Sequence, residues 1–254
     1  MKSPIRESTN NFKALSVLKT LIPKGDVIDS FLLFSGEMEL SLAESGRFVI
    51  AHTNKYVIYE FWKCAMENPA RIAELSESLY PIGDEKAFHL FQENWPKYQD
   101  HYTRSALFFL LNRCSESGWI SAGKFDDKNF NPLALSHLKK FSPKNFFLTM
   151  DNADTLNEAI ANSSTKGDYL LLPVGKFDYN FFEHGKSKGY EMTTVLHEEL
   201  FKHLSEIDKK WISIYKHHPR LYILYKDYNT IMIDKYGKRT EDKDICEEVI
   251  FANF

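Results

Sequence analysis

The chain has 254 residues, of which 43% are hydrophobic and 26% are charged, and its net charge is −3. This length can bury the core of one large α/β domain with a small lobe. A charge so close to balance excludes bulk electrostatic attraction to nucleic acid, so any such binding must come from a local basic patch.

Apolar periodicity predicts alternating helices and strands from the start of the chain. A helix at 12–22 ends at Pro23-Lys24-Gly25, and a strand at 27–34 leads through a turn into a helix at 38–43 and a strand at 48–51. A strand, a helix and a second strand this close together form a βαβ unit, which predicts a parallel sheet.

The later elements continue this alternation after a polar stretch, 67–103, that reads as a helical insertion. Further helices are expected at 56–66, 104–113, 133–141, 153–161 and 194–209, and further strands at 146–150, from 169, and at 211–215, 221–225 and 248–254. A basic turn, 235–239, precedes the last strand. These elements predict an α/β fold in which helices surround a mixed sheet that ends in antiparallel strands.

The compartment is indicated by the cysteines and by the absence of long apolar segments. Cys64, Cys114 and Cys246 have no CxxC spacing, which predicts free thiols in a reducing compartment. The N-terminal residues lack the apolar core of a signal peptide, and the longest apolar run, 106–111, is too short to span a membrane. We therefore expect a soluble, cytoplasmic protein without a membrane partner.

The strand that begins at Tyr169 is the place to look for chemistry, because ligands of α/β proteins bind at the carboxyl ends of central strands. It leads into Pro173-Val174-Gly175-Lys176 and then into an aromatic stretch, 177–182. This stretch offers no catalytic acid, no nucleophile and no obvious base where the strand ends.

Four segments occur in a specific order along the chain. They are Leu21-Ile22-Pro23-Lys24-Gly25, Ala51-His52-Thr53-Asn54-Lys55, Leu111-Asn112-Arg113 with Gly118, and the closing stretch 247–254. Together they resemble the Dam-like (D12 class) family of adenine-N6 DNA methyltransferases, whose A-D-x-N-K and L-N-R-x-x-x-x-G motifs the second and third segments match in part.

The resemblance implies a methyltransferase-like (Rossmann-like) mixed sheet flanked by helices, with a small helical lobe of the DNA-recognition type. Residues 1–66 and 142–254 would form the α/β core, and residues 67–141 would form the lobe. The family uses S-adenosylmethionine as its methyl donor and duplex DNA as its substrate.

Two cofactor motifs of the family are altered in this chain. The glycine-rich turn F-x-G-x-G corresponds to Phe34-Ser35-Gly36-Glu37-Met38, which keeps one glycine and puts a carboxylate and a bulky side chain where the backbone must approach the cofactor. The acid that would bind the ribose hydroxyls is replaced by His52, which cannot offer the two acceptors of a carboxylate.

The catalytic motif D-P-P-Y is altered as well. Its positions are Pro173, Val174, Gly175 and Lys176, which supply neither a side-chain acceptor for the target amine nor an aromatic face for a flipped base. Asp178 and Tyr179 follow closely and are the candidate substitutes. Tyr179, Phe181 and Phe182 are equally consistent with core or lid aromatics of a Phe-rich protein.

Basic and aromatic residues in the middle of the chain suggest a surface for DNA. The residues concerned are Arg104, Arg113, Lys124, Lys139, Lys140 and Lys144, with Trp119 and Phe125. They predict salt-dependent phosphate contacts, or else surface lysines over a small hydrophobic cluster. His197-Glu198-Glu199 lacks the second histidine of an H-E-x-x-H helix, because Phe201 occupies that position, so no metal site is expected.

Three hypotheses follow from this pattern. The first is a catalytically inactive homologue that acts as a DNA-binding or regulatory subunit, alone or beside an active methyltransferase, with no cofactor expected. The second is an active, divergent adenine-N6 methyltransferase that uses S-adenosylmethionine, Asp178, Tyr179 and the turn at 34–38. The third is a methyltransferase fold kept as a protein-interaction scaffold. The first predicts that the space bounded by Phe34, His52 and Pro173 is partly filled by Glu37 and Met38.

Overall fold

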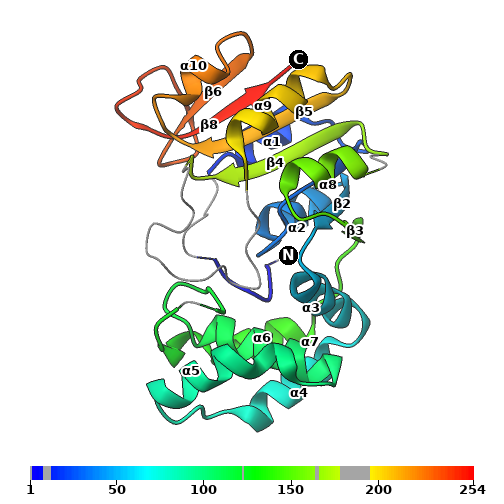
Figure 1. Ribbon diagram of the computed structural model, residues 1–254, viewed down its shortest axis with the longest axis vertical. Coiled ribbons are helices and arrows are strands. Elements are labelled where there is room, and N and C mark those ends of the chain that lie inside the picture. Colours follow the sequence, from blue (N-terminus) through cyan, green and yellow to red (C-terminus); the bar gives the residue numbers. More distant parts are fainter. Residues whose placement is uncertain (1, 8–12, 122, 164–165, 178–194) are drawn as a thin grey trace. The chain divides into compact units, whose positions relative to one another are not determined.

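A computed structural model describes residues 2–7, 13–121, 123–163, 166–177 and 195–254 (Figure 1). The described chain divides into two compact units. A helical unit contains residues 2–7 and 55–143, and a sheet unit contains residues 13–54, 144–177 and 195–254, apart from the gaps just named.

The sheet unit is built on one mixed sheet with the strand order β3-β2-β1-β4-β5-β8-β6-β7. The strands are β1 (Val27–Ser30), β2 (Phe48–Thr53), β3 (Phe146–Met150), β4 (Tyr169–Gly175), β5 (Lys210–Lys216), β6 (Asn229–Asp234), β7 (Arg239–Thr240) and β8 (Cys246–Ala252). The first five strands in this order, β3 to β5, run parallel, and β8 is antiparallel to both β5 and β6. The predicted α/β fold with a mixed sheet is confirmed.

Five helices belong to the sheet unit: α1 (Leu15–Leu21), α2 (Glu37–Glu44), α8 (Leu156–Asn162), α9 (His197–Glu206) and α10 (Leu221–Leu224). Leu170 and Leu172 of β4 face the same side of the sheet as Trp211, and α8, α9 and α10 pack there around one apolar core. On the opposite face, Glu39 of α2 accepts a hydrogen bond from Ser30 at 2.9 Å. The sheet therefore has helices on both faces, an arrangement compatible with a Rossmann-like fold.

The helical unit contains α3 (Tyr56–Glu67), α4 (Pro69–Leu79), α5 (Glu85–Asn94), α6 (His101–Arg113) and α7 (Pro132–Lys139), with 3₁₀ turns at Trp95–Lys97 and Asp127–Asn129. The apolar face of α3 packs on α6, where the rings of Phe61 and Phe108 stack with centroids 4.8 Å apart. The helical unit thus comprises residues 2–7 and 55–143 of the described chain, whereas the sequence prediction placed the lobe at 67–141.

Two predicted strands differ in the structure. The strand expected at 27–34 ends at Ser30, because Leu32 has a left-handed φ of 66° that no strand can contain. The strand expected at 221–225 is helix α10, and the strand β6 that follows it was not predicted. None of the described helices has the length and apolar composition that crossing a bilayer requires.

Candidate functional site

The order of the strands reverses between β1 and β4, and in open α/β sheets the crevice at such a point is where ligands bind. The loop after β1 ends at Gly36, whose φ of 65° caps the start of α2 and favours glycine. Phe34 and Met38 are buried, at 8% and 5% exposure, whereas Glu37 is exposed. Of the two side chains expected to fill this end of the sheet, Met38 is the one that points inward.

His52 lies inside β2 between two buried carboxylates. Its Nε2 is 3.2 Å from Oδ1 of Asp29 on β1, and its Nδ1 is 3.0 Å from Oδ1 of Asp151, which directly follows β3. The three residues are 3%, 1% and 7% exposed, and the ring of Phe31 stacks on the imidazole with centroids 4.3 Å apart. Both ring nitrogens of His52 are thus already bound within the protein.

Asp29 has further partners on its second oxygen. Oδ2 accepts hydrogen bonds from the backbone N–H of Gly167 at 2.7 Å and from Nζ of Lys209 at 3.1 Å. A chain of polar contacts thus runs from Asp151 through His52 and Asp29 to Lys209, within the described part of the sheet unit. We call these four side chains the Asp–His–Asp–Lys chain.

The electrostatics of this chain favour the charged forms of His52 and Asp29. Burial opposes the imidazolium of His52, but the hydrogen bonds and charges of Asp151 and Asp29 outweigh that effect and raise its pKa. Burial likewise works against the Asp29 carboxylate, but the hydrogen bonds from His52, Gly167 and Lys209 lower its pKa. An imidazolium held by two carboxylates is a donor on both sides, and it has no lone pair left for a ribose hydroxyl.

The carboxyl end of β4 holds residues 173–176, which the sequence analysis aligned with D-P-P-Y. Pro173, Val174 and Gly175 are all buried within the strand, and Gly175 has a φ of 79° beside a bulge in the pairing with β5. Val174 belongs to the apolar core, and Lys176 is exposed. No acceptor side chain therefore stands at these four positions, and the candidate substitutes Asp178 and Tyr179, with Phe181 and Phe182, lie outside the described residues.

Phe177 was named in the sequence only as the start of an aromatic stretch, yet the structure gives it defined neighbours. Its ring packs against His197 and His218 with centroids 4.7 and 4.9 Å apart, and lies 6.3 Å from the ring of Tyr215. His197 begins α9 and is 2% exposed, so its ring packs inside the sheet unit and does not lie on a solvated helix face. No local pattern in the sequence could predict these ring contacts, because the residues lie far apart in the chain.

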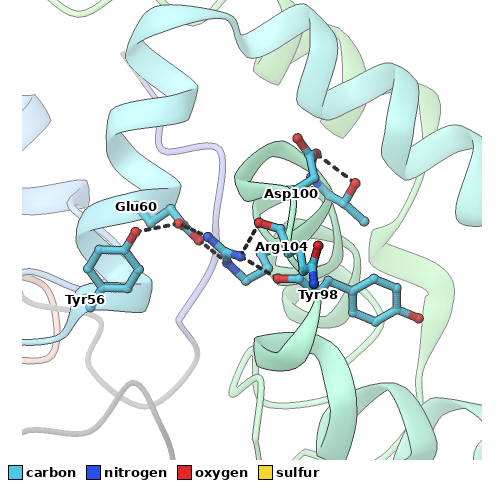
Figure 2. Close-up of polar contacts among 7 residues, drawn as sticks. Tyr56, Glu60, Tyr98, Asp100 and Arg104 are labelled. Atoms are coloured by element: carbon cyan, nitrogen blue, oxygen red, sulfur yellow. Dashed lines mark hydrogen bonds and ion pairs between the residues drawn. The ribbon is translucent and has the colours of Figure 1, made fainter.

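Arg104, expected on a DNA-facing surface, is instead committed to a network inside the helical unit (Figure 2). Its guanidinium pairs with both carboxylate oxygens of Glu60, with Nε at 2.7 Å from Oε1, and also donates to the backbone carbonyls of Tyr98 and Gln99. Tyr56 donates to the same carboxylate at 2.9 Å. The side chains of Arg104 and Glu60 are 16% and 7% exposed, so this ion pair holds α3 to α6.

Arg113 is also occupied within the helical unit. Nε donates to the carbonyl of Pro4 at 2.9 Å, and the guanidinium lies over the ring of Phe109. Burial, with a smaller contribution from Arg6, lowers the pKa of Arg113 to about 10. Of the other residues expected on a DNA-facing surface, Trp119 and Phe125 are half-buried. Lys124, Lys139, Lys140 and Lys144 are exposed, and Lys139 is paired with Glu77 at 2.9 Å.

The segment that resembles L-N-R-x-x-x-x-G anchors the beginning of the chain. The Asn112 side chain accepts from the N–H of Arg6 at 2.9 Å and donates to the carbonyl oxygens of Arg6 and Gly118 at 2.8 and 2.6 Å. Gly118 has a φ of 82°, and a Cβ at this position would lie 2.5 Å from the carbonyl oxygen of Arg6. The three motif residues therefore have structural partners within the helical unit.

A cavity of about 680 Å³ opens on the sheet face that carries His52. Its lining comes from β1, β2, β3 and α8: Val27, Asp29, Phe48, Ile50, His52, Phe147, Thr149, Met150, Asp151, Asn152, Ala159, Asn162, Ser163 and Lys166. The motif residues Phe34 and Pro173 are not part of this lining. We call this cavity the sheet-face pocket.

The cysteines and acidic clusters offer no further chemistry among the residues described. Cys64, Cys114 and Cys246 are free and buried, and burial raises the pKa of Cys114 to about 12, which keeps this thiol protonated. The described residues contain no group of three or more His, Cys, Asp or Glu side chains that could hold a metal ion. Neither a scan against protein-family models nor a search of curated proteins finds a match to this chain.

Proposed function

We propose that this chain is a Dam-like adenine-N6 DNA methyltransferase homologue without methyl transfer, acting as a DNA-binding or regulatory subunit. The observation that carries the proposal is the engagement of both ring nitrogens of His52 by Asp29 and Asp151. In the family, the residue at this position accepts hydrogen bonds from the ribose of S-adenosylmethionine, and His52 has no acceptor left to offer.

The fold supports the family assignment. Five strands of the sheet, β3, β2, β1, β4 and β5, run parallel, and the antiparallel strand β8 lies between β5 and β6. The strand order reverses between β1 and β4 and helices cover both faces, as expected for the Rossmann-like sheet that the resemblance implies.

The end of β4 supports the loss of activity. Methyl transfer to adenine N6 requires acceptors that orient the amine and an aromatic ring that holds the flipped base. Buried Pro173 and Val174 offer no side-chain acceptor, and exposed Lys176 offers no ring. An enzyme that lost these groups would lose most of the positioning on which its rate depends.

The cofactor is the first experimental test. Calorimetric titration with S-adenosylmethionine is expected to give no saturable heat up to millimolar concentrations, and adenine-containing duplex DNA is expected to incorporate no methyl groups. Saturable binding together with methyl incorporation would instead identify an active, divergent enzyme.

DNA binding is the second test, and Lys124 is the residue to change. Lys124→Ala is expected to weaken binding to duplex DNA about two- to threefold and to lower the slope of log K against log salt by about one, because one phosphate contact is lost. Lys86→Ala, an exposed lysine on α5, is the matched control. If the wild-type protein shows no salt-dependent DNA binding, the chain is an interaction scaffold and not a DNA-binding subunit.

A further inference from the structure

The two edges of the sheet are built differently. At one edge, β7 is only two residues long and begins with Arg239. At the other edge, the five residues of β3 carry no charge and pair with β2 without a bulge (Figure 1). Natural sheets protect their edges with very short strands, charged side chains, proline or bulges. β7 has the first two of these protections, and β3 has none of the four.

The backbone of β3 offers every second residue to a further strand. The carbonyl of Asn145, just before β3, accepts a hydrogen bond from β2 at 2.8 Å, and the N–H of Asp151, just after it, donates to β2 at 2.9 Å. In a parallel ladder every second residue bonds to the same neighbour, so the odd-numbered residues of β3 face β2. The N–H and C=O groups of Phe146, Leu148 and Met150 therefore point to the outer edge, where none of the described strands pairs with them.

The side chains along this edge are apolar or uncharged and remain accessible. Phe147 and Met150 are 52% and 37% exposed, and Leu148 and Thr149 are half-buried. When a strand is added to a sheet, main-chain hydrogen bonds supply affinity and alternate side chains supply specificity. The edge of β3 has both components of such a pairing surface.

The sequence of β3 is complementary to a second copy of itself in the antiparallel direction. Leu148 is the middle residue, so a two-fold axis through it pairs all five residues, and every outward backbone group meets an outward group of the second copy. Leu148 then lies opposite its own copy, Phe146 lies opposite Met150, and Phe147 lies opposite Thr149. These are apolar or uncharged cross-strand pairs, and pairs of this kind stabilise a sheet.

The charges that flank β3 select the same direction. Exposed Lys144 lies before the strand, and exposed Asp154 lies after it. Antiparallel pairing puts the basic end of one strand beside the acidic end of the other, whereas parallel pairing would put like charges together. A second copy is therefore a partner that fits this edge in its backbone pattern, its side chains and its charges.

We propose that the chain forms a two-fold symmetric dimer in which β3 pairs antiparallel with β3 of a second copy, with Leu148 on the axis. The two eight-stranded sheets then join into one continuous sheet. The interface uses neither His52 nor residues 173–176, so it stands or falls independently of S-adenosylmethionine binding.

The alternation of the backbone gives the sharpest test. Sedimentation equilibrium is expected to show a monomer–dimer equilibrium between about 10 μM and about 1 mM, because one pair of short strands makes a small interface. Hydrogen exchange followed by NMR should show protection that rises with concentration at the amides of Phe146, Leu148 and Met150. The amides of Phe147 and Thr149, bonded to β2, should be protected at every concentration. A protein that stays monomeric over this range, or a dimer with unchanged exchange at Leu148, would overturn the proposal.

A charge on the axis should break the dimer. Leu148→Lys places like charges opposite each other and is expected to raise the dissociation constant of the dimer at least about tenfold. The ladder with β2 is kept, because it uses the backbone groups of the neighbouring residues. Ile223→Lys adds the same charge at a 74% exposed position on α10 and should leave the dissociation constant unchanged. Equal dissociation constants for the two variants would refute the interface.

A disulfide on the axis tests the register, and it decides the matter if Leu148→Lys does not fold. Leu148→Cys is expected to give a disulfide-linked dimer on mild oxidation, because the Cα atoms of a hydrogen-bonded pair lie about 5.5 Å apart. Phe147→Cys is the matched control and should crosslink much more slowly, since its position faces Thr149 and not its own copy. The native cysteines are buried. Crosslinking that is no faster at 148 than at 147 would contradict the register.

Discussion

A histidine placed between two buried carboxylates ties the stability of the sheet unit to pH. The pKa of His52 in the folded protein is raised above its ordinary value of 6.5. The stability that its protonation adds is therefore fully present below pH 6.5 and is lost as the pH rises through the folded pKa. The folded pKa of Asp29 is lowered from 3.8, so its contribution is complete above 3.8 and is lost as the pH falls through the folded pKa. Between pH 3.8 and pH 6.5 both residues therefore contribute fully to the stability of the sheet unit.

His52→Gln is the variant that tests this linkage. The wild-type protein is expected to lose stability as the pH rises from 6 to 9, and the variant should lose much less over the same range because glutamine does not titrate. The variant should also be about 3 kcal/mol less stable at pH 6, because buried Asp151 loses its charged partner and Asp29 keeps only Lys209. Urea unfolding followed by circular dichroism at each pH measures both effects, and parallel pH profiles for the two proteins would contradict the assignment.

Arg104 separates a structural role from a DNA-binding one. Its bidentate pair with Glu60 is mostly buried, so Arg104→Ala is expected to lower the free energy of unfolding by about 3 kcal/mol by leaving the Glu60 charge unpaired. Arg104→Lys should recover little of this, because an ammonium cannot reproduce the fork of a guanidinium. A double-mutant cycle with Glu60→Gln measures the coupling. Lost DNA affinity at unchanged stability would instead favour the surface role.

The site could be predicted from the sequence only in part. The sequence singled out His52 and residues 173–176 because they fall where the resemblance would place functional motifs. Asp29 and Asp151 were not singled out, because they are 23 and 99 residues from His52 and meet it only through the register of three parallel strands. Arg104 and Arg113 look like any basic surface residues, and nothing local in the sequence reveals that Glu60 and Pro4 occupy them.

Most helices and strands followed from periodicity, and the exceptions have a physical cause. In 221–225 an apolar run reads as a strand, but Leu221 and Tyr225 are fully buried while Ile223 is 74% exposed. In a strand these three side chains would share one face, whereas in a helix positions i and i+4 share a face that i+2 does not. Strand β6 was missed because its side chains are mostly exposed or half-buried and carry no clear alternation.

Alanine substitutions in α10 test that assignment directly. Leu221→Ala is expected to cost about 3 kcal/mol of stability, as large-to-small changes in a core do, whereas Ile223→Ala should cost less than about 0.5 kcal/mol. The two variants remove similar amounts of side chain from neighbouring positions, so each controls for the other. Thermal unfolding of both gives the answer, and similar losses would argue for a strand.

At the level of the whole chain, the N-terminal residues belong to the helical unit although the sheet unit follows them directly in sequence. Asn112 and Gly118 create this connection. The Asn112 side chain accepts from the N–H of Arg6 and donates to its carbonyl oxygen, and Gly118 allows a close backbone approach. The Asn112-Arg113 and Gly118 positions of the resemblance therefore have an architectural role that is independent of any contact with DNA.

Asn112→Ala should destabilise the helical unit by about 3 kcal/mol, because the backbone groups of Arg6 and Gly118 lose the hydrogen bonds that the amide now makes with them. Gly118→Ala should cost about 2 kcal/mol or more, since it adds left-handed strain and a clash with Arg6. Glu116→Ala, on an exposed side chain of the same loop, is the matched control. Hydrogen exchange should show faster opening at the amides of Ile5 and Arg6 in the first two variants only, and unchanged protection there would contradict this anchoring role.

The position of β8 between β5 and β6 has a consequence for biosynthesis. During translation β5 and β6 leave the ribosome before the strand that separates them, so each waits with one edge unpaired until residues 246–252 emerge. Nascent chains with open edges invite pairing with other molecules. A nascent chain that stalls, or a chain that is truncated, shortly before residue 246 is therefore expected to aggregate. The sheet is completed only when the seven residues of β8 pair with both β5 and β6.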